Sequence, residues 1–224
     1  MVVAAMLAGC LDSPPMSVSG GTGDDGGIDT GDIDAGSCNT ILHNQFDNED
    51  EWEPYEEPET SVDVASDQVR ILVSPSECEA YADITSWTAA PIDRTELVAS
   101  LAIAGTTTGG AGISWASELE NDYFDLEVHA GIVEAIEKLA GIPGETVLCT
   151  ECPPYNPIKH ARMRLYARSG TVHYQVAAAT GEWTDIATTP VRPGSYEVIA
   201  FGFAEVDQVA DMTVSDLVWR ECNN

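Results

Sequence analysis

The sequence predicts an all-β fold, a sandwich or barrel of antiparallel strands, and three observations support this prediction. Short apolar segments recur from Ile41 onward, and residues that favour turns separate them. In the clearest segment, residues 161–168, apolar and polar side chains alternate with a period of two, as in a strand with one buried face. Strands do not alternate with long helical segments, which disfavours α/β folds.

The stretch from His160 to Ile186 predicts three neighbouring strands. Its first strand alternates apolar residues with four others, Arg162, Arg164, Tyr166 and Arg168. Ser169-Gly170 supplies a two-residue turn that can adopt positive φ, and the alternation then resumes in Val172, Tyr174 and Val176. Thr180-Gly181 turns the chain again, so we expect an antiparallel meander in the middle of the folded body.

Eight further segments have the length and composition of strands: Ile41–Phe46, Gln68–Val73, Glu79–Thr85, Glu96–Ala104, Ala111–Trp115, Tyr123–Ala130, Tyr196–Ala204 and Asp211–Arg220. Turn-forming clusters at 106–110 and 192–195 separate some of them. Residues 133–140 are mainly helix formers, so their conformation stays open.

The chain is strongly acidic, with 9 basic and 38 acidic residues among 224 and a formal net charge of −29. This charge repels nucleic-acid phosphates, so nucleic-acid binding is excluded as a function. The acidic surface either serves only solubility or also attracts cations. We therefore expect no cofactor, with calcium as the one alternative.

The N-terminus resembles a bacterial lipoprotein signal. Leu7-Ala8-Gly9-Cys10 matches the lipobox, in which the thiol of the final cysteine is lipidated. Residues 11–37 are rich in Gly, Asp and Ser and predict a flexible, disordered tether. The expected organisation is a signal segment at 1–10, a linker at 11–37 and one folded domain at 38–224. We expect a monomeric lipoprotein of the bacterial cell envelope, in the outer membrane, in the periplasm or at the cell surface.

Export implies an oxidising compartment, in which disulfides are expected. Setting Cys10 aside leaves an odd number of cysteines, and hence one unpaired thiol: Cys38, Cys78, Cys149, Cys152 and Cys222. A bond between Cys38 and Cys222, which bracket the domain, would join its first and last strands. Cys149 and Cys152 can close a small loop. The pairing stays open at this point, and no metal site is expected because zinc needs a second pair at ligand spacing.

Several motifs occur in a defined order along residues 38–222: Phe46-Asp47 near Trp52, Gly112-Ile113, Asp122-Tyr123, Arg162-Met-Arg-Leu, Tyr174, Thr180-Gly181-Glu182-Trp183 and Asp216-Leu217. This order resembles concanavalin A-like lectin/glucanase (laminarin-G-like) domains. The resemblance implies a two-sheet antiparallel jelly-roll sandwich whose concave face often holds the ligand. It also implies that the last strand returns beside the first, which suits a Cys38–Cys222 bond. The fold carries both sugar binders and hydrolases.

Glucanases that the chain resembles carry an E-x-D-x-x-E strand motif, and retaining hydrolysis needs two carboxyl groups about 5–5.5 Å apart. The best match is Glu120-Asn-Asp122-Tyr-Phe-Asp125, in which Asp125 replaces the final Glu and shortens the side chain. We therefore expect no catalytic residues. A glycoside hydrolase that uses Glu120 and Asp125, with Asp122 between them, is the alternative.

The basic strand offers a binding face, because Arg162, Arg164 and Arg168 share one side with Tyr166. Arginine forks can hold sugar hydroxyls or carboxylates, and a ring can stack on a pyranose. The structural alternative is pairing with acidic side chains of neighbouring strands, such as Glu127 or Glu197.

Among the tryptophans, Trp183 and Trp219 are expected in the core. Trp115 lies in a segment where an exposed ring could meet a saccharide, as do Trp52, Tyr55 and Trp87. The sequence thus predicts a non-catalytic carbohydrate-binding protein whose polysaccharide or surface glycan contacts Arg162, Arg164, Tyr166, Arg168 and Trp115. Besides the hydrolase, the remaining alternative is a protein–protein interaction module of the envelope that binds no sugar.

Overall fold

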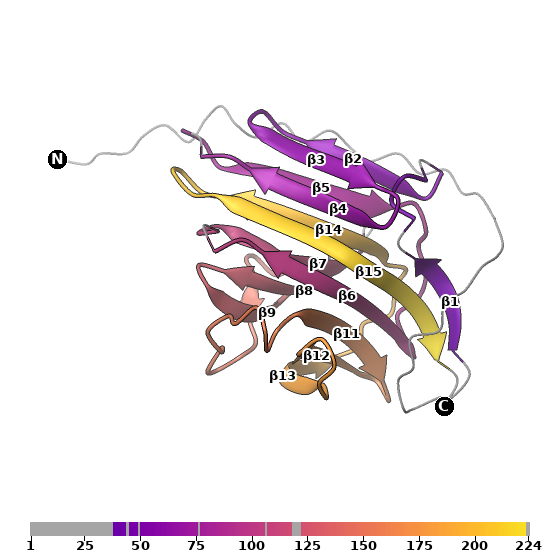
Figure 1. The fold of residues 1–224 in the computed structure, drawn as a ribbon. Helices are drawn as coiled ribbons and strands as arrows, with labels where there is room; N and C mark the ends of the chain where they lie inside the picture. The colour runs from indigo at the N-terminus through magenta and orange to yellow at the C-terminus, as the bar shows by residue number, and fades with distance from the viewer. Residues whose placement is uncertain are drawn as a thin grey trace.

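The computed structural model describes residues 38–43, 45–48, 50–75, 77–105, 107–117 and 122–222. Within these ranges the chain forms fifteen strands and no helix. The strands make two antiparallel sheets that pack face to face (Figure 1). The prediction of an all-β, two-sheet sandwich is therefore confirmed. The expected lipobox and linker lie outside the described residues, and no helix in the described part could cross a membrane.

The first sheet contains eight strands in the order β13-β12-β11-β6-β15-β4-β3, and β1 pairs with one end of β15. Their bounds are β1 (Cys38–His43), β3 (Thr60–Ala65), β4 (Gln68–Val73), β6 (Thr95–Ile103), β11 (Arg162–Arg168), β12 (Thr171–Ala177), β13 (Thr184–Pro190) and β15 (Ala210–Cys222). Strands β11 to β13 are the predicted meander, and Ser169 and Gly170 at its first turn both have positive φ. The meander lies at one edge of the sheet and not in its middle, because β13 pairs only with β12.

The second sheet has the order β10-β9-β8-β7-β14-β5-β2. Its strands are β2 (Trp52–Glu56), β5 (Ala80–Ser86), β7 (Gly110–Ser117), β8 (Asp122–His129), β9 (Ile132–Lys138), β10 (Thr146–Val147) and β14 (Glu197–Ala204). The segment rich in helix formers is strand β9, joined to β8 by a tight turn at Ala130 and Gly131, both with positive φ. Pairing with β8 overrides the helix propensity of this segment.

The core lies between the two sheets and is built from the inward side chains of both. Its largest fully buried members include Trp52, Trp115, Trp219, Tyr174, Tyr196 and Phe124. The placement of Trp219 confirms the sequence-based expectation. The expectation for Trp183 is wrong, because its ring is partly exposed and lies against the guanidinium groups of Arg162 and Arg164.

Two disulfides join the expected cysteines. Cys38–Cys222 links β1 to the end of β15, where the two strands pair, as the family resemblance implied. Cys149–Cys152 closes a short loop between β10 and β11. Cys78 is disulfide-bonded as well. The expected unpaired thiol is therefore not found in the described part of the chain.

Candidate functional site

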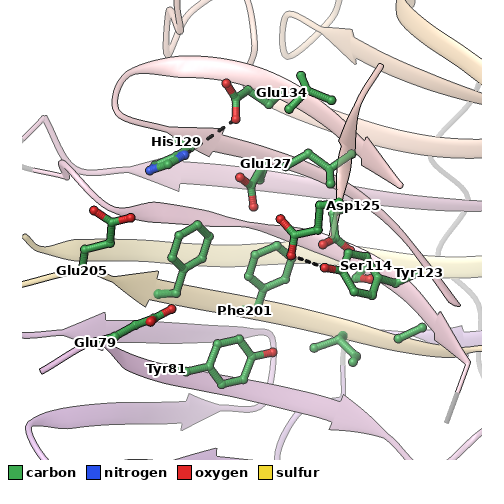
Figure 2. Close-up of a pocket in the computed structure, with 16 residues that line it drawn as sticks. Glu79, Tyr81, Ser114, Tyr123, Asp125, Glu127, His129, Glu134, Phe201 and Glu205 are labelled. Carbon is green, nitrogen blue, oxygen red and sulfur yellow. Dashed lines mark hydrogen bonds and ion pairs between the residues drawn. The ribbon is translucent and has the colours of Figure 1, made fainter. Parts of the chain in front are cut away.

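A cleft of about 510 Å³ lies on the outer face of the second sheet (Figure 2). Its floor is β7, whose outward positions carry only small residues: Gly110, Gly112, Ser114 and Ala116. A Cβ atom at Gly110 would lie 2.0 Å from the ring of Phe203, and one at Gly112 would lie 2.7 Å from Cβ of Glu127. The small residues therefore leave the room that side chains of β8 and β14 occupy on either side of the floor.

Strand β8 supplies an acidic wall. Phe124, Leu126 and Val128 point into the core, so the intervening residues face the cleft: Tyr123, Asp125, Glu127 and His129. Strand β9 adds Glu134, which lies directly opposite Glu127 in the strand register. Six carboxyl groups line the cleft, and none of the described residues that line it is Lys or Arg. The cleft is thus strongly acidic, and His129 is the one basic side chain among the described residues that line it.

The two central carboxyl groups are poorly solvated. The Ser114 hydroxyl hydrogen-bonds one oxygen of Asp125, whereas Asp125 Oδ1 is buried without a partner. Burial raises the pKa of Asp125 to about 7. Glu127 Oε1 is likewise buried without a partner, and burial, with the charges of Asp125, Glu134 and Glu145, raises the pKa of Glu127 to about 9. Both groups therefore retain a proton at unusually high pH.

An aromatic row, consisting of Tyr55, Tyr81, Phe201 and Phe203, crosses the same face. Successive ring centroids are 6.4, 6.4 and 6.3 Å apart, and the Tyr81–Phe201 and Phe201–Phe203 pairs are nearly parallel. The row ends at the acidic wall, where the rings of Phe203 and His129 are 5.3 Å apart. The rings of the row and the carboxyl groups of β8 thus lie on opposite sides of the small-residue floor, and Glu79 and Glu205 lie on the side of the rings (Figure 2).

One histidine and two carboxylates in this cleft are close enough to share a metal ion. The donor atoms of Glu127, His129 and Glu134 all lie within 4.8 Å of one another, and His129 Nδ1 is 3.7 Å from Glu134 Oε2. Sequence analysis predicted no metal site and missed this cluster. The available signal was Asp125-x-Glu127-x-His129, a period-two pattern within a strand that was predicted.

The alternative catalytic motif is described only in part. Glu120 lies outside the described residues. Asp122 and Asp125 are three positions apart on a strand without a bulge, so they point to opposite faces. Asp122 is buried and accepts a hydrogen bond from the backbone N–H of Ala140. The carboxyl group that shares a face with Asp125 is that of Glu127.

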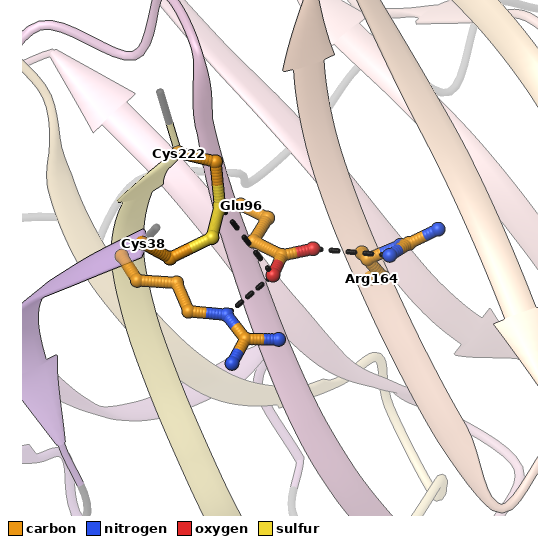
Figure 3. Close-up of a disulfide and its surroundings, with 5 residues drawn as sticks. Cys38, Glu96, Arg164 and Cys222 are labelled. Atoms are coloured by element: carbon orange, nitrogen blue, oxygen red, sulfur yellow. Dashed lines mark hydrogen bonds and ion pairs between the residues drawn. A yellow bond between two sulfur atoms is a disulfide. The ribbon is translucent and has the colours of Figure 1, made fainter. Parts of the chain in front are cut away.

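The predicted binding residues of β11 lie together on the outer face of the first sheet, on the opposite side of the molecule. Arg164 donates to Glu96 at 3.0 Å and to Gln175 at 2.7 Å, and Arg220 also pairs with Glu96, beside the Cys38–Cys222 bond (Figure 3). The acidic partner is thus Glu96 of the neighbouring strand β6. It is neither Glu127 nor Glu197, which lie in the other sheet.

We call the outer face of β11, with Arg162, Arg164, Tyr166 and Arg168, the basic face. Its remaining residues differ in how many of their polar groups already have partners. Arg162 donates to the backbone carbonyls of Ala178 and Gly181, at 3.2 and 3.1 Å. Tyr166 lies beside Arg164, 4.9 Å from ring centroid to guanidinium carbon, whereas Arg168 is exposed. Trp115 does not join them: it is fully buried in the core of the sandwich, so the expectation of an exposed ring is wrong.

A cleft of about 690 Å³ beside Arg162 and Arg220 also lies on the first sheet. Although it is the larger of the two, no aromatic ring is among the described residues that line it. Its walls are mainly small and aliphatic side chains, so it lacks the combination of rings and carboxyl groups found on the second sheet.

No protein-family model matches this chain, and no curated protein matches it. Solved structures do resemble it. A β-1,3-glucanase from Mycobacterium marinum is 13% identical, with 81% of this chain and 98% of that chain covered and a TM-score of 0.58. The exoplasmic/lumenal domain of VIP36, in its Ca²⁺- and Man3GlcNAc-bound form, is 11% identical, with coverage of 77% and 84% and a TM-score of 0.57.

A legume lectin-like domain from Entamoeba histolytica is 10% identical, with 77% of this chain and 91% of that chain covered and a TM-score of 0.53. Likeness at such low identity establishes the architecture alone. The chain therefore has a concanavalin A-like jelly-roll fold.

Proposed function

We propose that the protein binds a glycan in the cleft on the outer face of the second sheet. The observation that supports this most directly is the aromatic row beside the acidic wall. Aromatic rings pack on the apolar faces of sugars, and carboxyl groups accept hydrogen bonds from sugar hydroxyls. The lectins and glycoside hydrolases among the structural neighbours act on such ligands and support the same substrate class.

This proposal moves the site away from the basic strand. The guanidinium groups of Arg162 and Arg164 already have carbonyl, carboxylate and amide partners. A ligand would have to replace those contacts, whereas the cleft holds polar atoms without partners in Asp125 and Glu127. The cleft is therefore the stronger candidate.

The test uses the full chain on a glycan array, followed by calorimetric titration with the best glycan. Tyr81→Ala and Phe203→Ala should each weaken binding about fivefold, since a stacked ring contributes about 1 kcal/mol. Tyr81→Phe keeps the ring and should retain most of the affinity. Arg168→Ala, on the other sheet, is the matched control and should bind as the wild type does. Equal binding by all four variants would contradict the proposed site. Silence across the array would favour the protein–protein alternative.

Hydrolysis is a second candidate, favoured by the side chains of Asp125 and Glu127 on one face. A retaining glycosidase needs one protonated and one ionised carboxyl group. With pKa values of about 7 and about 9, these residues would hold different protonation states just above neutral pH. Release of reducing sugar by the wild type, but not by Asp125→Asn or Glu127→Gln, would support this function. No release by the wild type from a panel of β-glucans would eliminate it.

For the cellular location, we propose a lipid anchor at Cys10, supported by the Leu7–Cys10 motif and the Gly- and Asp-rich segment that follows. The test is mass spectrometry of the N-terminal peptide from bacterial membranes, after reduction. A thioether-linked lipid survives reduction. A Cys10 recovered as a free thiol would contradict the anchor.

A further inference from the structure

We propose that Glu127, His129 and Glu134 bind a divalent transition-metal ion, of the Mn²⁺ or Zn²⁺ type, at the end of the cleft. The proposal does not rest on glycan binding, because it concerns three side chains that can be tested without any sugar. It does bear on catalysis: a metal ion held by Glu127 would occupy the carboxyl group that hydrolysis needs as its acid.

The backbone already brings the three side chains together. Glu127 and Glu134 are direct partners in the β8–β9 register, and His129 lies two residues along β8 on the same face. The two strands belong to one hairpin, closed by the turn at Ala130 and Gly131. Ligands from rigid, paired strands lose less freedom on binding than ligands from loops. The Phe203 ring, 5.3 Å from that of His129, restricts the imidazole on its other side.

The donor atoms are nearly close enough as they stand. Each of the three residues offers one atom within 4.8 Å of the other two. Ligands bound to one ion at about 2.0–2.2 Å lie about 3–3.5 Å from one another. Small side-chain rotations would therefore complete the coordination.

An independent observation points to a ligand at this position. The Glu127 side chain is almost completely buried, with a residue exposure of 2%, and its Oε1 atom has no partner. A buried polar atom without a partner is costly, and an ion or ordered water is a common explanation for one. None of the described residues that line the cleft is Lys or Arg, so no fixed positive side chain compensates it there.

The donor set indicates which metals fit. An imidazole with two carboxylates suits Mn²⁺ and Zn²⁺, whereas Ca²⁺ takes six to eight oxygen ligands and rarely an imidazole. Three protein ligands leave coordination positions open. Those positions face the cleft, where water or a ligand hydroxyl would complete the shell.

The experiment measures metal binding to the full chain after treatment with EDTA and dialysis. Isothermal titration with Zn²⁺, and electron paramagnetic resonance of added Mn²⁺, should each detect one saturable site. His129→Ala and Glu134→Gln should weaken that site at least tenfold. His173→Ala is the matched control, because His173 Nδ1 also lies 3.2 Å from a carboxylate, that of Asp185, but on the other sheet.

The result that would overturn the proposal is equal binding by the wild type and both cluster variants. That outcome would show that the acidic surface attracts cations diffusely. An equal loss in His173→Ala would overturn it as well. Circular dichroism of each metal-free variant verifies that it is folded, and Glu134→Gln, a nearly isosteric change at a partly exposed residue, keeps the test valid if His129→Ala unfolds.

Discussion

The two outer faces of the sandwich carry opposite kinds of polar groups. On the first sheet, the arginines of β11 and β15 surround one buried carboxylate, Glu96, and their groups are largely paired. On the second sheet, Asp125 and Glu127 hold buried oxygens without partners, beside a row of rings. The basic face is the more conspicuous in an acidic sequence, yet its charges are used for structure. The contrast is why we place the proposed binding site by unsatisfied polar atoms next to a cleft and not by unusual composition.

The largest effect is expected at Glu96, the centre of the basic face. Replacing Glu96 with Ala would leave the guanidinium groups of Arg164 and Arg220 facing each other without their carboxylate. Removal of one partner of a buried ion pair costs about 3–5 kcal/mol. Urea unfolding should show a loss in this range, with Arg168→Ala unchanged as the exposed control. A Glu96→Ala variant as stable as the wild type would show that the ion pairs of Glu96 with Arg164 and Arg220 do not stabilise the fold.

The floor of the cleft should tolerate no side chain at Gly112. A Cβ atom there would lie 2.4 Å from the Leu126 carbonyl oxygen and 2.7 Å from Cα and Cβ of Glu127. Gly112→Ala should therefore cost about 1–3 kcal/mol and also displace Glu127. The expected result is weaker glycan binding and weaker metal binding in a protein that still folds. Normal binding by this variant would place the ligand elsewhere.

The pH dependence of stability separates the two faces further. Glu127 holds its proton up to a pKa of about 9 in the folded protein, against an ordinary value of 4.5. Between these values the unfolded chain releases a proton that the folded chain keeps, so the free energy of unfolding falls as pH rises. Above about pH 9 both states are ionised and the loss is complete.

Glu127→Gln removes this dependence. Urea unfolding in EDTA at pH 5, 7 and 9 should therefore show the variant gaining stability relative to the wild type as pH rises. Saturating Zn²⁺ or Mn²⁺ should reduce the loss in the wild type, because a metal ion favours the ionised carboxylate. If the stabilities of the wild type and Glu127→Gln changed with pH in the same way, the Glu127 carboxyl group would not be buried without a compensating charge.

The smallest effect is expected at Trp183, whose ring lies 4.7 Å from the guanidinium carbon of Arg162 and 4.4 Å from that of Arg164. A partly exposed cation–π contact contributes about 0.5–1 kcal/mol. Trp183→Ala should lower stability by about that amount and leave the affinity for the glycan unchanged. A loss of glycan binding in this variant would return the site to the basic face.

The sequence predicts central strands well and edge strands poorly. Strands such as β4, β6, β14 and β15 have neighbours on both sides and carry the period-two or fully apolar patterns that burial requires. The strands that were missed, β2, β3 and β10, all lie at sheet edges. Edge strands tolerate residues such as Pro54 of β2, which central strands exclude. Strand β9 was ambiguous because its pairing with β8, and not its composition, determines its conformation.

The site was harder to predict than the fold. The alternation of Asp125, Glu127 and His129 is visible in the sequence, but the sequence-based interpretation used positions 120–125 and did not consider Glu127 and His129. Glu134 joins them only through the β8–β9 hairpin, and the aromatic row collects rings from three strands, β2, β5 and β14. Such long-range neighbours depend on strand order, which local patterns do not contain. The Cys38–Cys222 bond was predictable because the family resemblance implied that first and last strands pair.

The most direct test of the central claim is amide chemical-shift mapping of the full chain by NMR, during titration with a glycan identified on the array. Binding in the cleft predicts that the largest shifts cluster at the floor and walls, around Ser114 of β7, Glu127 of β8 and Phe203 of β14. Shifts confined to β11 and β12, around Arg164 and Tyr166, would contradict the assignment of ligand binding to the second sheet.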